Sequence, residues 1–260
     1  MDMDNRFAVL IDADNVSERY IKFILDEISN DGVATYKRIY GDWTKPALGT
    51  WKNVLLDYSI TPIQQYGYTT GKNATDSAMI IDAMDILYSG NVEGFCIVSS
   101  DSDFTRLAVR LRESGMVVVG MGEKKTPPAF IAACNKFRYL EVLAQDEASE
   151  NQLPEDTQQE GPAEMTPLEN IRAAVRTIVQ EISDDDGRAF LGEIGNMLVR
   201  RYPDFDVRNY GFRKLTPFLK SLEIFDIYSE KSSDGYNKLV YVKERNASVP
   251  QHIKLSRSGK

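Results

Sequence analysis

The chain has 260 residues, of which 42% are hydrophobic and 27% are charged, as is ordinary for one or two globular domains. Its single histidine, His252, lies near the C-terminus, which excludes histidine-based zinc sites and Ser-His-Asp catalysis. Two isolated cysteines indicate reduced thiols, and no apolar run approaches the roughly 20 residues that span a bilayer. We therefore expect a cytoplasmic protein that does not contact a membrane.

The net charge of −8 is unevenly distributed. Residues 1–143 carry −4, residues 144–165 carry −7, residues 166–245 carry zero and residues 246–260 carry +3. Much of the acidity therefore lies in one short segment. This distribution predicts no strong global attraction for phosphate, and it leaves room for a locally basic face.

Residues 1–143 are expected to form the first domain, in which apolar β-type runs alternate with helical patterns. Near-continuous apolar strands that alternate with helices predict an α/β fold with a parallel sheet covered on both faces. Strands are expected at Phe7–Ile11, Ala34–Tyr40, Ile60–Gln65, Phe95–Val98, Met116–Gly120 and Arg138–Leu140. Helices are expected at Ser17–Ser29, Lys45–Tyr58, Thr75–Tyr88, Phe104–Glu113 and Pro128–Cys134.

Two of the expected strands end directly in Asp-x-Asp. Asp12 and Asp14 follow the first strand, and Asp101 and Asp103 follow the fourth. Ligands of parallel sheets bind beyond the carboxyl ends of the strands, so the four carboxylates are expected to converge. Like charges held so close raise each other's pKa unless a cation neutralises them. The pattern predicts Mg²⁺ or Mn²⁺ held by oxygen ligands.

Asp76, near the start of the Thr75–Tyr88 helix, is a fifth candidate ligand. Considered alone, Asp76 would be interpreted as a carboxylate stabilised by the helix dipole. Because four other aspartates are expected to converge nearby, we expect Asp76 to belong to the metal site. Asp12 and Asp101 are the firmest expected ligands, because each ends its strand directly. Asp103 has the alternative of capping the following helix, and Asp14 is the aspartate expected most to be a helix cap.

Several polar side chains accompany these carboxylates. We expect Asn15, Ser99, Ser100 and Lys72 to contact a substrate phosphate or a metal-bound water, with turn or solvated positions as the alternative. Asp82 and Asp85 are interpreted as structural or solvated. A cluster of carboxylates with these neighbours suits phosphodiester hydrolysis, in which bound metal lowers the pKa of water and stabilises the leaving oxygen.

Residues 144–165 are acidic and contain Gln and Pro, which predicts a flexible linker. Residues 166–245 are expected to form a second, α+β domain. Thr166 and Pro167 resemble the start of a helix, and two further helices are expected at about Phe190–Arg201 and Asn209–Ser221. With a hairpin of Phe225–Ser229 and Leu239–Val242, this is a winged-helix arrangement. Residues 246–260 form a basic tail.

The first domain resembles the NYN domain of the PIN-like nuclease superfamily, and within it the bacterial LabA-like group. The resemblance rests on the segments Ile11–Asn15, Lys72–Asp76 and Val98–Phe104 and covers about residues 6–143. It implies a Rossmann-like α/β sandwich and a metal-dependent ribonuclease that leaves 5′-phosphate and 3′-hydroxyl ends. It also implies that Asp12, Asp76, Asp101 and Asp103 are the catalytic, metal-binding residues.

The second domain resembles the OST-HTH (LOTUS) domain through the segment Asp206–Leu215 and the later Phe225-Asp226-Ile227. That resemblance implies a winged-helix module that binds RNA. The expected third helix would present four cations to RNA phosphates. A protein-interaction module with a solvated charged face is the alternative. The four expected RNA-binding cations are Arg208, Arg213, Lys214 and Lys220.

Together these features predict a ribonuclease domain joined by a flexible linker to an RNA-recruiting domain, which would raise the local concentration of RNA. One alternative is a regulatory RNA-binding or protein-interaction protein without catalysis. A second is a haloacid-dehalogenase-type phosphatase with Asp12 as nucleophile. That chemistry needs a later acidic strand end, and the strand Met116–Gly120 is followed by Met121 and Gly122.

Overall fold

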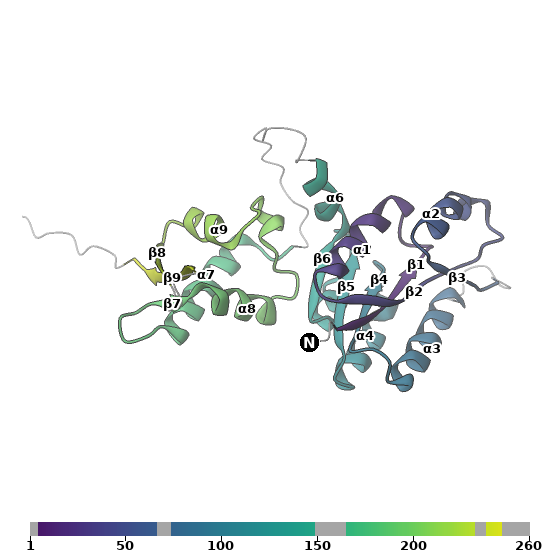
Figure 1. Ribbon diagram of the computed structural model, residues 1–260, viewed down its shortest axis with the longest axis horizontal. Coiled ribbons are helices and arrows are strands. Elements are labelled where there is room, and N and C mark those ends of the chain that lie inside the picture. Colours follow the sequence, from purple (N-terminus) through teal and green to yellow (C-terminus); the bar gives the residue numbers. More distant parts are fainter. Residues whose placement is uncertain (1–4, 67–73, 149–164, 232–237, 246–260) are drawn as a thin grey trace, which may run out of the picture.

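The computed structural model describes residues 5–66, 74–148, 165–231 and 238–245. The first domain is built on a six-stranded parallel sheet with the order β3-β2-β1-β4-β5-β6 (Figure 1). The expected α/β class is therefore confirmed. The strands are β1 (Arg6–Asp12), β2 (Val33–Gly41), β3 (Thr61–Gln64), β4 (Gly94–Val98), β5 (Val117–Gly122) and β6 (Lys136–Tyr139).

Helices cover both faces of this sheet, because successive side chains of a strand point to opposite faces. Ala8 and Leu10 of β1 pack in the core beneath α3, α4 and α5, while Phe7, Val9 and Ile11 pack beneath α1, α2 and α6. These helices are α1 (Ile21–Ser29), α2 (Trp51–Asp57), α3 (Ala74–Ser89), α4 (Thr105–Glu113), α5 (Pro128–Ala133) and α6 (Leu140–Ala148). Short 3-10 turns, η1 (Glu18–Tyr20), η2 (Pro46–Thr50) and η3 (Ser102–Phe104), precede α1, α2 and α4.

Helix α6 was not expected from the sequence. It begins directly after β6 and continues to Ala148, so the expected boundary at residue 143 lies inside a helix. Val142 and Leu143 are buried against the sheet, which gives the start of α6 an apolar face. The acidic composition of residues 144–165 concealed this helical turn. Residues 149–164 of the expected linker lie outside the described residues.

The second domain contains three α-helices and a small antiparallel sheet of order β7-β9-β8 among its described residues. Its elements are α7 (Leu168–Ile182), β7 (Ala189–Phe190), α8 (Leu191–Arg201), η4 (Val207–Tyr210), α9 (Leu215–Ser221), β8 (Phe225–Lys231) and β9 (Lys238–Glu244). The helices and the hairpin agree with the expected winged-helix order. Residues of α7, α8, α9 and the hairpin share one apolar core.

Two details of this domain differ from the sequence-based expectation. The third helix is interrupted, because Gly211 adopts a left-handed φ of 79° that separates η4 from α9. Thr166 does not cap α7, since Pro167 is the N-cap residue. Thr166 instead donates its backbone N–H and its hydroxyl to the buried carboxylate of Asp204.

The two domains are in direct contact along β6. The backbone N–H of Phe137 donates to the carbonyl oxygen of Pro203 at 2.7 Å, and Met165 packs against the core of the first domain. The hydroxyl of Tyr139 also donates to Asp204 at 3.5 Å. The second domain is therefore anchored to the edge of the parallel sheet, and the linker is not the only connection between the domains.

Four charged side chains reinforce this contact. Arg208 donates to both Glu27 of α1 and Asp206, and Arg138 of β6 donates to Glu27 at 2.9 Å and lies 3.4 Å from Asp206. Their side chains are 11–22% exposed. Burial favours the neutral carboxylic acids, but hydrogen bonds and charge from the arginines prevail and hold the pKa values of Glu27 and Asp206 below their ordinary values.

None of the described helices is long and apolar enough to cross a membrane.

Candidate metal centre

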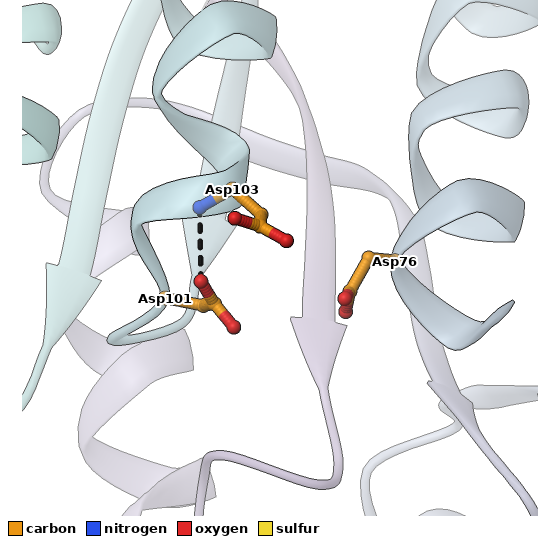
Figure 2. Close-up of side chains that lie close together, drawn as sticks. All are labelled: Asp76, Asp101 and Asp103. Carbon is orange, nitrogen blue, oxygen red and sulfur yellow. Dashed lines mark hydrogen bonds between the residues drawn. The ribbon is translucent and has the colours of Figure 1, made fainter. Parts of the chain in front are cut away.

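Asp101 and Asp103 lie in the connection between β4 and α4. Val98 ends β4, and Asp101 then acts as the N-cap of η3 by accepting the backbone N–H of Asp103 at 2.9 Å. Asp101, and not Asp103, is therefore the capping residue. The cap leaves the second oxygen of Asp101 and the carboxylate of Asp103 near each other at the carboxyl end of the sheet (Figure 2).

Asp76 completes a group of three carboxylates. It lies in the first turn of α3, and Figure 2 shows its side chain pointing toward Asp101 and Asp103. One carboxylate oxygen from each residue lies within 4.8 Å of the others. Two oxygens that share a Mg²⁺ at about 2.1 Å each are at most about 4.2 Å apart. The donor set therefore fits a hard divalent cation after a small inward movement of the side chains.

The pKa of Asp76 is raised by burial and by the negative charges around it. Partial burial, together with the charges of Asp12, Asp101 and Asp103, raises it to about 6. A carboxylate with such a pKa is poorly compensated by the protein alone. A cation between the three carboxylates would remove the repulsion, so the electrostatics agree with the donor geometry.

Asp12, an expected ligand, is not part of this group and is only 1% exposed. Its Oδ2 accepts hydrogen bonds from Asn15 Nδ2 at 2.7 Å and Ser99 Oγ at 2.8 Å, and its Oδ1 accepts from the Asp14 backbone N–H at 3.0 Å. Burial raises the pKa of Asp12, and these hydrogen bonds oppose the rise. Three donors thus orient the carboxylate at the end of β1, where its charge acts on Asp76.

The two serines after β4 are both buried and hydrogen-bonded within the protein, and their expected contact with a substrate stays a prediction. Ser99 is fully buried; its Oγ donates to Asp12 and accepts the backbone N–H of Asp101 at 3.1 Å. Ser100 is also buried and accepts the backbone N–H of Glu123 after β5. Hydroxyls bonded in this way position the carboxylates and the strand ends. Gly122 permits this close packing, since an added Cβ would lie 2.6 Å from Ser99 O.

The sequence favoured Asp14 as a helix cap, but Asp14 does not cap the following turn. The turn η1 has Ser17 as its N-cap residue and no side-chain cap. The Asp14 carboxylate instead accepts from Lys45 Nζ at 3.2 Å and from Thr75 Oγ1 at 3.3 Å. It therefore connects the end of β1 to the start of α3.

Lys45 is a candidate phosphate-binding residue that the sequence did not indicate. It immediately precedes η2, in a part of the sequence that resembled only the start of a helix, and no local motif marks it. Its ammonium group is half-exposed beside Asp14 and lines a hollow of about 340 Å³ with Asn15 and Trp51. The expected phosphate-binding Lys72 lies outside the described residues.

The cations expected to bind RNA are dispersed in the second domain. Arg208 is engaged by Glu27 and Asp206, so its charge is used in the contact between the domains, and its expected contact with RNA stays a prediction. Arg213 and Lys214 are exposed in the connection after Gly211, and only Lys220 lies on α9. The break at Gly211 explains why these residues do not share one helical face.

Asp82 has the structural role expected of it. Its carboxylate accepts from Arg38 and from the hydroxyl of Tyr40, both on β2. This bonding holds α3 against the sheet and explains why Asp82 takes no part in the carboxylate group.

The fold and the position of the carboxylates define the class of the protein: an α/β nuclease-like domain followed by a winged-helix module. The NYN domain model matches residues 6–141, and the chain belongs to the NYN domain family. The OST-HTH/LOTUS domain model matches residues 166–236. The chain thus joins a domain of a nuclease family to a module of a family that generally binds RNA.

Two solved structures are similar to parts of the chain. One is a protein of unknown function from Vibrio parahaemolyticus, with 17% identity, a TM-score of 0.44 and coverage of 54% of this chain and 94% of that chain. The other is an uncharacterised protein from Nitrosomonas europaea, with 27% identity, a TM-score of 0.29 and coverage of 39% and 100%. At these TM-scores neither likeness bears on function. No curated protein matches the sequence.

Proposed function

We propose that the chain is a divalent-metal-dependent ribonuclease that hydrolyses RNA phosphodiester bonds in its NYN domain and contacts RNA also through its second domain. The observation that carries the proposal is the group of Asp76, Asp101 and Asp103, with one oxygen of each within 4.8 Å of the others. NYN and other PIN-like nucleases generally depend on divalent metal. The donor set is made only of oxygens, as Mg²⁺ and Mn²⁺ prefer.

Each residue of the site has a distinct task in this proposal. Asp76, Asp101 and Asp103 would hold the cation, and Asp12 would add its negative charge to theirs. Ser99 and Asn15 keep the Asp12 carboxylate in one orientation through their hydrogen bonds. Such partners of a metal-binding group tune its affinity. When bound, Mg²⁺ or Mn²⁺ would supply a Lewis acid and lower the pKa of a coordinated water.

Lys45 would act on the substrate side of the site. Its ammonium group is half-exposed, and its partner Asp14 is an exposed residue whose backbone N–H donates to Asp12. An incoming phosphate could take the lysine from Asp14, since phosphate offers strong acceptor oxygens to an ammonium group. Lys45 would then neutralise a non-bridging phosphate oxygen and hold the scissile bond near the three carboxylates.

The burial of Asp12 argues against phosphatase chemistry with Asp12 as nucleophile. A nucleophilic carboxylate needs an accessible oxygen directed at the phosphorus atom. Asp12 is 1% exposed and both of its oxygens accept hydrogen bonds from the protein. The regulatory alternative without catalysis makes a different prediction: RNA binding with no cleavage.

The decisive experiment compares cleavage by three forms of the full-length protein. End-labelled single-stranded and hairpin RNAs are incubated with wild-type protein in Mn²⁺, in Mg²⁺ and in EDTA. Asp101→Asn tests the site. Asp85→Asn is the matched control, because Asp85 is an exposed residue of α3 outside the three-carboxylate group. We expect cleavage by the wild type and by Asp85→Asn with metal, and none by Asp101→Asn or in EDTA.

Product ends and folding complete the test. Phosphatase treatment and ligation would identify 5′-phosphate and 3′-hydroxyl ends, and circular dichroism would establish that Asp101→Asn is folded. Cleavage by pure, folded Asp101→Asn at the wild-type rate would refute the assignment of the site. RNA binding without cleavage under every metal condition would favour the regulatory alternative.

A further inference from the structure

A groove lies between the two domains, away from the carboxylate group. Its volume is about 870 Å³, and both domains line it. The first domain supplies the end of α4, the end of α5 and the start of β6. The second supplies α8 and the segment from Pro203 to Val207. Figure 1 shows α8 on the side of the second domain that faces β6. The groove therefore exists only when the domains are docked.

Five of the sixteen residues that line the groove are basic, in a chain whose net charge is −8. Its lining has one acidic residue, Asp206. Three of its cations are already paired: Lys136 with Asp31, Arg138 with Glu27 and Asp206, and Arg201 with Glu181. The cations of the lining are Arg112, Lys136, Arg138, Arg200 and Arg201.

Two arginines remain without a carboxylate partner among the described residues, one on each domain. Arg112 of α4 is exposed and donates only to carbonyl oxygens at the end of α5, at 3.2–3.5 Å. Arg200 of α8 is exposed and has no hydrogen bond or ion pair with a described residue. Two guanidinium groups with spare donors thus line the groove from opposite domains.

The chemistry of this lining suits the phosphodiester backbone of a nucleic acid. Guanidinium groups donate two parallel hydrogen bonds to phosphate oxygens and are the preferred partners of phosphates. Asn135 and Asn196 add exposed amides to the same groove, and such amides commonly contact phosphates, sugars or base edges. A carboxylate-rich protein would also attract two arginines, but the function proposed above supplies an RNA partner.

Helix α4 connects the groove to the metal centre. The helix begins at Thr105, two residues after Asp103, and ends near Arg112. Arg106 and Arg110 are both exposed and lie one helical turn apart, on the same side of α4. Nine residues of α-helix extend about 13 Å. Arg110 also lies 3.9 Å from Glu113, and Arg112, two residues further along, projects from a different side of the helix. The length of α4 thus separates the metal centre from the groove by a distance that a few nucleotides can span.

We propose that the interdomain groove is an RNA-binding site in which Arg112 and Arg200 hold backbone phosphates, while the remainder of the strand follows α4 to the metal centre. The proposal rests on the proposed ribonuclease function for the identity of the ligand. It assigns RNA contact to the junction of the domains, in place of the single basic helix that the sequence predicted. Docking of the domains then determines which stretch of a bound RNA reaches the carboxylates.

Binding without cleavage tests this site. Fluorescence anisotropy of a labelled 20-nucleotide single-stranded RNA is measured in EDTA with the full-length protein, at several salt concentrations. We expect Arg112→Glu with Arg200→Glu to raise Kd about tenfold and to lower the salt dependence by about 1.4 in log–log slope, as for two lost phosphate contacts. Arg200→Glu alone, at an exposed position without a partner, should fold normally and give part of the effect.

Two single charge reversals, which match Arg200→Glu alone in charge, serve as controls. Lys52→Glu changes an exposed lysine of α2, on the opposite face of the sheet from α4, and should leave Kd within about twofold. Lys220→Glu changes the lysine of α9 that sequence reasoning favoured. A larger loss of affinity for Lys220→Glu than for the double variant would move the RNA site to α9 and overturn the proposal. Unchanged affinity in the folded double variant would also overturn it, and would leave an acidic protein as the partner to seek.

The outcome is separable from that of the ribonuclease proposal. Binding is measured without metal, so a protein that never cleaves RNA can still show the loss at Arg112 and Arg200, which supports the groove. A protein that cleaves RNA, but binds it equally well with both arginines replaced, retains its catalytic assignment and loses the groove.

Discussion

Arg208 Nη2 lies 2.9 Å from Glu27 Oε1, a contact between residues that are 181 positions apart in the chain and belong to different domains. The guanidinium of Arg208 also contacts Asp206, and Arg138 joins the same carboxylates. This network explains how a second domain with zero net charge is held against the first. It also gives a structural role to Arg208, which lies in the segment Asp206–Leu215 that resembles the OST-HTH domain.

The first prediction concerns the strength of this contact. In a double-mutant cycle of Glu27→Gln and Arg208→Gln, we expect a coupling energy of about 1–2 kcal/mol, because the pair is largely shielded from water. Urea unfolding of the four proteins measures it. The exposed pair Arg176–Glu244, at 2.7 Å within the second domain, is the control and should give about 0.5 kcal/mol or less. Equal coupling in the two pairs would contradict the prediction.

The second prediction concerns metal and stability. Mn²⁺ or Mg²⁺ should raise the melting temperature, because a cation relieves the repulsion among Asp76, Asp101 and Asp103. At a metal concentration of about 100 Kd the free energy of unfolding should rise by about 2.7 kcal/mol. Differential scanning fluorimetry with and without EDTA measures the shift. It should disappear in Asp101→Asn and persist in Asp85→Asn; a melting temperature indifferent to both metals would argue against the site.

The third prediction follows from the pKa of Asp76, which lies near 6 in the absence of metal. A raised carboxylate pKa means that folding favours the proton, so the stability of the metal-free protein should fall as pH rises from 3.8, the ordinary value, to about 6. Metal competes with the same proton, so Mn²⁺ affinity should fall about fivefold between pH 6 and pH 5. Calorimetric titration across this range measures it. In Asp76→Asn, Mn²⁺ affinity should be weaker at pH 7 and should no longer change between pH 6 and pH 5. If the pH dependence of the affinity is unaltered in this variant, the competing proton belongs to another group.

The fourth prediction separates two adjacent buried serines. Ser99→Ala removes the donor to Asp12 Oδ2, and Ser100→Ala removes the acceptor of the Glu123 N–H. Each should destabilise the fold by about 1–3 kcal/mol. Only Ser99→Ala should also lower metal affinity or cleavage, by about 10–100-fold, because it alone acts on Asp12. If both variants lose a comparable amount of activity well below their melting temperatures, Ser99 contributes to stability and has no specific effect on Asp12.

Much of this fold could be predicted from local patterns. The parallel sheet follows from continuous apolar strands such as Phe7–Ile11, and α3 follows from helical periodicity over Thr75–Tyr88. The convergence of Asp101 and Asp103 with Asp76 follows from parallel topology, because the carboxyl ends of the strands share one edge.

What the sequence could not supply depends on contacts between distant residues. The partners of Arg208 require a docked second domain, so its charge looked available for RNA. Asp14 resembled a cap because Asp commonly precedes helices, whereas its actual partners are Lys45, just before η2, and Thr75 of α3. The break at Gly211 was hidden because the surrounding residues have helical spacing. The role of Ser99 depends on the distance between β1 and β4, which no motif encodes.

The hydrogen bond from Phe137 N to Pro203 O has a consequence for how the chain can be divided. Strand β6 is the last strand of the sheet, and an uncovered outer edge invites pairing with other chains. The second domain occupies part of that edge, so it also shields the first domain from self-association. A fragment cut in the acidic segment would expose this edge, so the first domain alone is expected to be less soluble than the full-length chain.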